Sequence, residues 1–385
     1  MARSAGRVLA VFLSVLLCLS PGRPAAAGSI NIPVMTQNLY LGANTDPLFA
    51  AKTLPELQTA IVNAANSVNA SNFPLRSTAI AAEAANAGGP LLIGLQEAEI
   101  VGQTGQPPLL NYADTLIAAL KTTGLNYTYM IPGVGAAVHT GLSLDSTAAG
   151  FPPGSPNFVS VTDQDVVLVR TDVPGLKVTS VSAQTFTNTG TVTSPLFGPI
   201  SLERGYVLVD ATLDGMPFQF VSTHLDGSLA DGSRTLANPL EVGEILTALG
   251  ASGQPQLVVG DFNATPSDLC GGLPCGPAEM LEAGFANIGA ALGPTCCQSP
   301  DLGNTVSILN REYDYIFEKG FSSTDLATLI GNQPFENVPP LWPSDHAGVV
   351  TLTEVPEPTA AALLVPALLL FGAAGLRGRT QQRSS

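Results

Sequence analysis

Residues 256–263 read QLVVGDFN, and this stretch is the starting point for both the fold and the chemistry. The apolar run Leu257-Val258-Val259 predicts a buried strand, because β-branched residues pack well on a pleated surface. The strand is expected to span Gln256 to Val259, so that Asp261 and Asn263 follow it at the edge of the sheet. An aspartate or asparagine after a strand is usually only a turn former, so this segment alone predicts little.

Four other segments repeat the pattern of polar residues at the end of an apolar strand. They are Thr36-Gln37-Asn38, Gln96-Glu97, Thr223-His224 and Ser344-Asp345-His346. A rigid sheet commonly presents its functional side chains at such ends. We therefore expect the five segments to converge on one concave site.

The side chains in these segments suit metal binding and proton transfer. Their oxygen donors are the kind that Mg²⁺, Mn²⁺ or Ca²⁺ prefers, and they belong to Asn38, Glu97, Asp261, Asn263 and Asp345. The chain has three histidines, and two of them, His224 and His346, lie in the five segments. The third, His139, lies in a glycine-rich stretch without such neighbours and is interpreted as a structural residue.

Helical and strand patterns alternate along the chain. Apolar runs on both sides of Asp214-Gly215 predict a β-hairpin, and alanine-rich stretches predict helices over 48–70 and 76–87. Residues 131–160 are dense in Gly, Pro, Ser and Thr and predict a long surface loop. This mixture favours an α/β fold of two packed sheets with helices outside over a doubly wound parallel sheet.

The motifs together resemble the endonuclease/exonuclease/phosphatase superfamily, which has the deoxyribonuclease I-like fold. In order along 35–350 they are T-x-N, L-Q-E, T-H-L, G-D-F-N, Y-D-Y-I-F and S-D-H. The strings TQNLYLGAN, RSTAIAAE, TCCQSPDL and LWPSDHAGV are similar to one secreted bacterial branch of it. The resemblance implies a two-sheet α/β sandwich with helices on the outer faces and the site at the sheet edges.

The resemblance also implies a divalent metal, with Mg²⁺ expected first and Mn²⁺ or Ca²⁺ as alternatives. Glu97 would be the principal ligand, with Asn38 beside it, and Asp345 would bind the metal or support its neighbour. A metal is chemically reasonable because a phosphodiester gains negative charge in the transition state, which a cation stabilises.

The implied catalytic roles fall on five residues. Asp261 and Asn263 would orient the attacking water and hold the transferred phosphoryl group, with Asp261 as the general base in one version of the mechanism. His346, oriented by a carboxylate such as Asp314, would hydrogen-bond the phosphate or take the proton. His224 matches the position where nuclease and sphingomyelinase branches carry a second histidine.

Two arginines lie in or near the motifs, and only the first is a candidate for contact with the substrate. Arg204, in an R-G-Y context, matches a phosphate-contacting arginine of the nuclease branch, and an exposed arginine at the end of a strand is an equal alternative. The family often has an arginine two residues before the aspartate of D-Y-I-F, where this chain has Glu312. Arg311 is one residue further away and would lie on the other face of a strand, so an orienting role for it is not expected.

Both ends of the chain resemble targeting segments. Residues 1–27 have a basic start, an apolar run and the triplet Ala25-Ala26-Ala27, which predict a signal peptide removed by signal peptidase. Residues 355–385 begin V-P-E-P, continue with an uncharged apolar stretch over 359–376, and end with three arginines. This order resembles the PEP-CTERM sorting signal of Gram-negative bacteria, and an ordinary tail anchor is the alternative.

These ends predict an exported protein whose catalytic domain spans residues 28–354. The transmembrane segment 359–376 would tether it to the membrane until an exosortase-type enzyme releases it to the cell surface or extracellular matrix. In an oxidising compartment the remaining four cysteines favour disulfides over a zinc site. Cys270 and Cys275 flank a short Gly-Gly-Leu-Pro loop and are expected to pair, while Cys296 and Cys297 are left unassigned.

Net charge narrows the substrate classes without choosing among them. Outside the two end segments the chain has nine Lys and Arg against 29 Asp and Glu, a net charge near −20, and no basic stripe for nucleic acid. The expected activity is that of a phosphodiesterase, with the nuclease branch slightly favoured. A sphingomyelinase-like lipid phosphodiesterase, a phosphomonoesterase and a non-catalytic matrix protein on the same fold are the alternatives.

Overall fold

The computed structural model describes residues 32–102, 110–131, 134–145, 150, 160–227, 234–321, 326–337 and 339–352. The chain divides into Met1–Ile30 and Asn31–Ser385, and all described residues belong to the second unit. The predicted signal peptide, the sorting tail and the apolar segment 359–376 lie outside the described residues. No helix among the described residues is long and apolar enough to cross a membrane.

A nine-stranded sheet forms one half of the second unit. Its order is β20-β23-β1-β2-β9-β3-β4, with β5 and β8 also paired to β9. The strands are β1 Val34–Asn38, β2 Leu92–Gln96, β3 Ile100–Gly102, β4 Leu110–Asn111, β5 Tyr127–Thr128, β8 Ala137–Asp145, β9 Ser160–Arg170, β20 Leu326–Ile330 and β23 Gly348–Leu352.

A six-stranded sheet forms the other half, in the order β10-β13-β14-β15-β19-β18. Its strands are β10 Leu176–Thr185, β13 Gly205–Leu213, β14 Met216–His224, β15 Gln256–Asp261, β18 Ala286–Asn287 and β19 Asp314–Lys319. Small two-stranded pieces complete the described strands: β6 Met130–Ile131 with β7 Val134–Gly135, β11 Gly190–Ser194 with β12 Gly198–Leu202, β16 Leu269–Cys270 with β17 Leu273–Pro274, and β21 Glu336–Asn337 with β22 Pro340–Leu341.

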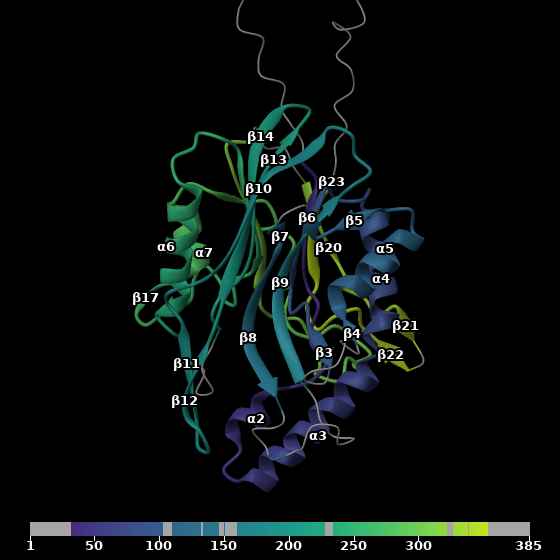
Figure 1. Cartoon of the computed structure of the whole chain (residues 1–385), viewed down its shortest axis with the longest axis vertical. Helices are drawn as coiled ribbons and strands as arrows, with labels where there is room; N and C mark the ends of the chain where they lie inside the picture. Colours follow the sequence, from purple (N-terminus) through teal and green to yellow (C-terminus); the bar gives the residue numbers. More distant parts are fainter. Residues whose placement is uncertain are drawn as a thin grey trace, which may run out of the picture. The chain divides into compact units, whose positions relative to one another are not determined.

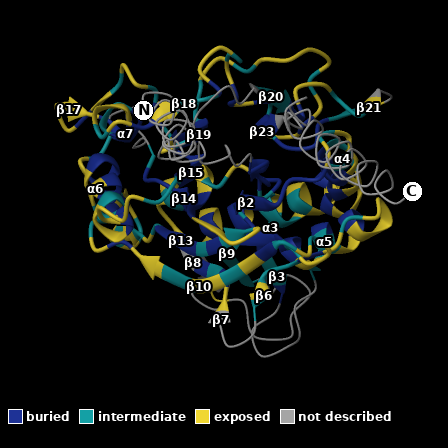
Figure 2. Cartoon of the chain, turned by 90° about the horizontal axis from the view of Figure 1, so that it is seen from above, coloured by how far each residue is buried: buried dark blue, intermediate teal, exposed yellow. Residues whose placement is uncertain are grey.

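The two large sheets pack face to face, with β1 and β2 of one against β14, β15 and β19 of the other. Close approach at this interface requires Gly94, because a Cβ there would press on Ser222 and Val259 of the opposite sheet. The facing strands are accordingly buried (Figure 2).

Helices cover the outer faces of both sheets. The described helices are α2 Asp46–Ala50, α3 Leu54–Ser71, α4 Phe73–Asn86, α5 Tyr112–Thr122, α6 Ala237–Leu249 and α7 Gly276–Glu282. Helices α4 and α5 flank the nine-stranded sheet, and α6 and α7 flank the six-stranded one (Figure 1). The predicted fold class, a two-sheet α/β sandwich with helices outside, is confirmed.

Two local predictions were wrong. The expected loop at 131–160 contains β8, whose backbone pairs with β9 from Ala137↔Val166 onward, so pairing with an available sheet neighbour outweighs a weak strand composition. The expected helix at 48–70 is two helices, because Thr53 caps a new start: its hydroxyl accepts from the N–H of Glu56, whose carboxylate accepts from the N–H of Lys52. The hairpin at Asp214-Gly215 is confirmed, with Leu213 opposite Met216.

Candidate active site

Strand pairing aligns three of the predicted residues in the six-stranded sheet. His224 at the end of β14 lies opposite Asp261 at the end of β15, and Asp261 lies opposite Asp314 at the start of β19. This alignment of His224, Asp261 and Asp314 requires a glycine at position 260. Gly260 has a φ of +149°, and a Cβ there would collide with the carbonyl of Thr223 on the neighbouring strand.

The facing sheet contributes the oxygen donors. Asn38 ends β1 opposite Gln96 of β2, so Glu97 follows directly beside it. The Nδ2 of Asn38 donates to Glu97 Oε1 at 3.0 Å and to Asp261 Oδ2 at 3.1 Å. One amide therefore connects carboxylates from the two sheets at a single point.

Backbone turns at these strand ends are unusual. Tyr40, Glu97 and Asn263 all have φ between +51° and +58°, in the left-handed region that residues other than glycine rarely adopt. The N–H groups of Tyr40 and Leu41 donate to Asn38 Oδ1 and Glu97 Oε2, at 2.9 and 3.0 Å. Such conformations cost energy and gather at functional sites.

The carboxylates repel one another in this structure. Burial raises the pKa of Asp345 from its ordinary 3.8 to about 7, and the charges of Glu97 and Asp261 add to the rise. Burial also raises the pKa of Asp261, to about 6, with Asp314 contributing. A positive charge nearby would therefore stabilise the ionised forms of both acids.

The donors near Asp261 are of the kind that a divalent cation prefers, and one ligand atom each of Asp261, Asp314 and His346 lie within 4.8 Å of one another. Glu97, Asp261 and Asp345 offer carboxylate oxygens and Asn38 offers an amide oxygen, which are hard ligands suited to Mg²⁺, Mn²⁺ or Ca²⁺. A cation would also relieve the repulsion that holds the pKa values of Asp261 and Asp345 above their ordinary range.

His346 and Asp314 form a hydrogen-bonded pair on the other side of Asp261. His346 Nδ1 lies 2.7 Å from Asp314 Oδ2, and His346 Nε2 lies 3.7 Å from Asp261 Oδ2. Burial alone would lower the pKa of His346, but Asp314, Asp261 and Asp345 outweigh it and hold the pKa well above the ordinary 6.5. His346 is therefore an imidazolium when no metal is bound.

His224 has the opposite electrostatic setting. Burial, the positive charge of Arg204 and the nearby His346 hold the pKa of His224 well below 6.5, so this imidazole is neutral. Both of its ring nitrogens face N–H donors: Arg204 Nη1 lies 3.1 Å from Nδ1 and Asn263 Nδ2 lies 2.9 Å from Nε2. A neutral imidazole has one acceptor nitrogen, so only one of these contacts is a hydrogen bond. Environments that separate the pKa values of two like groups usually give them different tasks.

Arg204 sits among buried acids that the sequence analysis did not single out. Its Nη1 lies 3.7 Å from Asp163 Oδ2, and Asp165, also buried, acts on it electrostatically. Burial and the charge of Asp163 raise the pKa values of both Asp165 and Glu99 well above the ordinary range. The available signal was T-D-Q-D at the entrance to a buried strand, where charged residues are rare.

Arg76 of α4 was also missed, although it supports two of the site's strand ends. Its guanidinium is fully buried and donates to the carbonyls of Leu39 and Tyr40, just after Asn38, and to that of Pro343, just before the S-D-H segment, at 2.7–2.9 Å. The signal was a single arginine inside the alanine-rich string RSTAIAAE.

The remaining predicted residues lie as follows. Cys270 is disulfide-bonded to Cys275, with Cα atoms 5.1 Å apart, and Cys296 is disulfide-bonded to Cys297. Arg311 contributes its backbone carbonyl, which accepts from the N–H groups of residues 295 and 296. The backbone of His139 lies in β8, and its side chain is outside what the structure describes.

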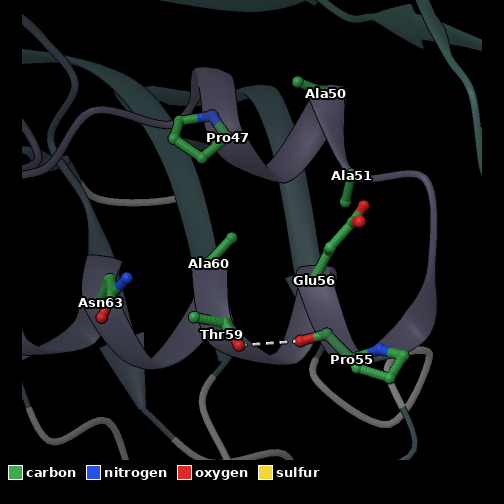
Figure 3. A pocket seen from close by; sticks show the side chains of 8 residues that line it. All are labelled: Pro47, Ala50, Ala51, Pro55, Glu56, Thr59, Ala60 and Asn63. Carbon is green, nitrogen blue, oxygen red and sulfur yellow. Dashed lines mark hydrogen bonds between the residues drawn. The ribbon is translucent and has the colours of Figure 1, made fainter.

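A separate hollow between α2 and α3 contains none of these residues (Figure 3). Its walls are mostly apolar, from Pro47, Ala50, Ala51 and Ala60, and its one charged side chain, Glu56, caps α3. That carboxylate stands alone and accepts from the N–H of Lys52 at 2.7 Å, so we assign the site to the strand ends.

Comparison with known proteins gives similarity of structure only. No protein-family model and no curated protein sequence matches the chain. The structure is similar to an endonuclease/exonuclease/phosphatase family protein from Leptotrichia buccalis, at 16% identity and a TM-score of 0.49 over 84% of this chain and 100% of that one. An endonuclease/exonuclease/phosphatase from Beutenbergia cavernae aligns at 17% identity and a TM-score of 0.49, over 83% and 70%. TDP2 from D. rerio, complexed with single strand DNA product, aligns at 14% identity and a TM-score of 0.46, over 83% and 97%.

Proposed function

We propose that this chain is an exported, divalent-metal-dependent phosphoesterase that cleaves phosphodiesters, with nucleic acid as the favoured substrate class. The observation that carries the proposal is a cluster of acids and histidines at the strand ends. Asn38 donates to both Glu97 and Asp261, and Asp345 lies close enough to feel the charges of both. One ligand atom each of Asp261, Asp314 and His346 lie within 4.8 Å of one another. Buried acids this close together destabilise a fold unless a cation offsets their charge. Such clusters usually occur at functional sites.

The metal would be held by Glu97 and Asn38, with Asp345 beside them. When bound, a divalent cation would offset the charge that the phosphate gains in the transition state. The ring of His346, whose imidazolium form Asp314 favours, would add positive charge from the other side of Asp261.

In this proposal Asp261 and His346 carry out the two proton transfers of hydrolysis. The water oxygen bonds to phosphorus and gives a proton to Asp261, whose pKa of about 6 suits a general base near neutral pH. The bond from phosphorus to the leaving oxygen breaks, and the imidazolium of His346 donates a proton to that oxygen. Asp314 then keeps the ring oriented for the next cycle.

His224 and Asn263 would hold the phosphoryl oxygens. The Nδ2 of Asn263 and the ring of His224 lie together beside Asp261, and a neutral imidazole donates a hydrogen bond without taking the proton of the reaction. Arg204 Nη1 contacts His224 Nδ1, the ring nitrogen away from Asn263. We therefore assign Arg204 to positioning this ring as well as to adding positive potential.

The experiment is a metal-dependent activity screen of residues 28–354. Substrates are plasmid DNA, single-stranded DNA, RNA, sphingomyelin and small phosphomonoesters, each with Mg²⁺, Mn²⁺, Ca²⁺ or a chelator. Turnover of a diester that the chelator abolishes is expected. Glu282→Gln, at an exposed position in α7, is the matched control for Glu97→Gln. Chelator-resistant turnover, or no turnover of any substrate, would remove the proposal and favour a matrix protein on the same fold.

We propose separately that residues 1–27 direct export and that residues 355–385 tether the chain until an exosortase-type enzyme removes them. The support is the order of basic, apolar and small residues at one end and V-P-E-P, apolar stretch and arginines at the other. Intact-mass measurement of the protein from the cell surface is expected to show both ends removed. Recovery of a chain that retains residues 355–385 in the membrane would instead indicate a permanent tail anchor.

A further inference from the structure

Residues Thr295–Gln298, here called the strap, hold the histidine segment by its backbone. The N–H of Ala347 donates to the carbonyl of Thr295 at 2.7 Å, and the N–H of Gln298 donates to the carbonyl of Asp345 at 2.8 Å. The strap therefore contacts the chain on both sides of His346, and its position relative to that imidazole is fixed by the backbone.

The other side of the strap is fixed as well. The N–H groups of Asn310 and Arg311 donate to the carbonyl of Cys296 at 2.8 and 3.0 Å. The hydroxyl of Thr295 accepts from the N–H of Asp314 at 3.0 Å. The strap thus links Asp314 and His346, the two members of the hydrogen-bonded pair.

The strap brings two sulfur atoms to the reacting face of His346. Cys297 Sγ lies 3.8 Å from His346 Nε2, and the two sulfurs and one ring nitrogen of His346 all lie within 4.8 Å of one another. Cys296 is buried at 2% exposure, whereas Cys297 is exposed. The proposed reaction uses neither sulfur.

These three atoms differ in kind from the donors of the proposed Mg²⁺ site. Thiolate sulfur and imidazole nitrogen select soft or borderline ions such as Zn²⁺ and Cd²⁺, whereas carboxylates select hard ones. Nδ1 of His346 is engaged by Asp314, and Nε2, which lies 3.7 Å from Asp261 Oδ2, also faces Cys297 Sγ at 3.8 Å. A carboxylate on the far nitrogen of a metal-binding histidine orients the ring and raises its basicity.

We propose that Cys296, Cys297 and His346 form a thiol-dependent site for a soft divalent ion, separate in chemistry from the site of the catalytic metal. A small dithiol opens it: the dithiol is oxidised to its cyclic disulfide, and the bond between Cys296 and Cys297 is reduced to two thiols. Binding of the ion then releases the two thiol protons, together with any proton on His346 Nε2. Occupation removes Nε2 from phosphoester chemistry, and this inhibitory consequence alone rests on the proposed function.

The test measures binding directly. The full-length chain is reduced with a dithiol, desalted, saturated with Mg²⁺ to fill the oxygen site, and titrated with Cd²⁺. The readout is the ultraviolet charge-transfer absorption of a cadmium–thiolate bond, which oxygen ligands do not give. We expect one equivalent of Cd²⁺ to bind through this pair in the reduced chain and none in the unreduced chain.

Matched variants assign the signal to its residues. Cys296→Ser/Cys297→Ser is expected to lose it, while Cys270→Ser/Cys275→Ser, the same change at the other pair, is expected to keep it. If the latter variant does not fold, the difference between wild type and Cys296→Ser/Cys297→Ser still measures the signal. His346→Gln is expected to keep the thiolate band but to weaken Cd²⁺ binding about tenfold or more.

Equal titrations of wild type and Cys296→Ser/Cys297→Ser would overturn the proposal, and so would unchanged affinity in His346→Gln. Absence of phosphoesterase activity would count against the proposed function without altering the expected cadmium–thiolate band. Failure of the band in an active enzyme would count against this site alone.

Discussion

Asp314 and His346 are 32 residues apart in the sequence, and their side chains meet in a buried hydrogen bond of 2.7 Å between Oδ2 and Nδ1. Each partner is fixed independently, Asp314 by Thr295 Oγ1 at 3.0 Å and His346 by Ser344 Oγ at 3.2 Å, each of which accepts from the backbone N–H. The bond therefore sets which nitrogen of His346 faces the reaction and keeps that ring charged.

Asp314→Asn is expected to impair turnover through the protonation of His346. Loss of the carboxylate removes the largest charge that raises the pKa of His346, so this pKa falls. If the imidazolium is the acid, activity disappears as pH rises through its pKa, and a lower pKa moves the basic limb of the pH–rate profile to lower pH. We expect kcat at neutral pH to fall about 100-fold, the lower end for loss of acid–base catalysis. An unmoved basic limb would show that Asp314 does not act through His346.

Glu97→Gln and Asp261→Asn are expected to separate metal binding from proton transfer. Glu97→Gln keeps the shape and removes the charge, so the Mg²⁺ concentration for half-maximal activity should rise about tenfold or more and turnover should drop with it. Asp261→Asn should lower kcat by about 100-fold or more with a smaller change in that concentration, because it loses the base. Kinetics at several Mg²⁺ concentrations distinguish the two, with Glu282→Gln as the unaffected control. Wild-type rates in Glu97→Gln would contradict the metal mechanism.

The strand-end residues of the site could be predicted because each follows an apolar run that is visible in the local sequence. In QLVVGDFN an apolar run gives the strand and the following polar residues give its end, so Asp261 and Asn263 are visible without knowledge of the partner strand. The two sheets and the hairpin at Asp214-Gly215 follow from the same local patterns.

What could not be predicted depends on contacts across the chain. The strand β8 forms because β9 offers a pairing edge, and nothing in its sequence AVHTGLSLD specifies that partner. Arg76 is recognisable only once the carbonyls around it are in place. The distance of 3.8 Å between Cys297 and His346 likewise follows from two long-range backbone contacts of the strap, which no spacing between residues 297 and 346 reveals.

Arg76→Lys is expected to destabilise the chain although it keeps the charge. The ammonium group of lysine cannot reproduce the planar fork that reaches the carbonyls of Leu39, Tyr40 and Pro343 together. At least one buried carbonyl would lose its donor, so the free energy of unfolding should fall by about 1–3 kcal/mol. Denaturant titration with and without Mg²⁺ measures this loss, and Mg²⁺ affinity should fall as well because Asn38 and Asp345 lose their support. An exposed Lys121→Arg in α5 is the control for a basic exchange, and stability equal to wild type in Arg76→Lys would show that charge alone suffices.

The metal-free protein is expected to lose stability as pH rises, and Asp345 should account for part of the loss. Its pKa is 3.8 ordinarily and about 7 in the folded chain, so between these values the folded state holds a proton that the unfolded state has released. Stability therefore falls as pH rises through this window, and Asp345→Asn, which cannot ionise, should lack that part of the slope. Thermal or denaturant unfolding from pH 4 to pH 8 in a chelator measures both proteins, and the expected difference in their change of unfolding free energy is on the order of 1 kcal/mol or more.

With saturating Mg²⁺ the wild-type loss should shrink or reverse, because the bound ion favours the ionised carboxylate. Parallel pH dependences for wild type and Asp345→Asn in the chelator would mean that this carboxyl is already ionised in the metal-free fold, and the repulsion assigned to it would be absent.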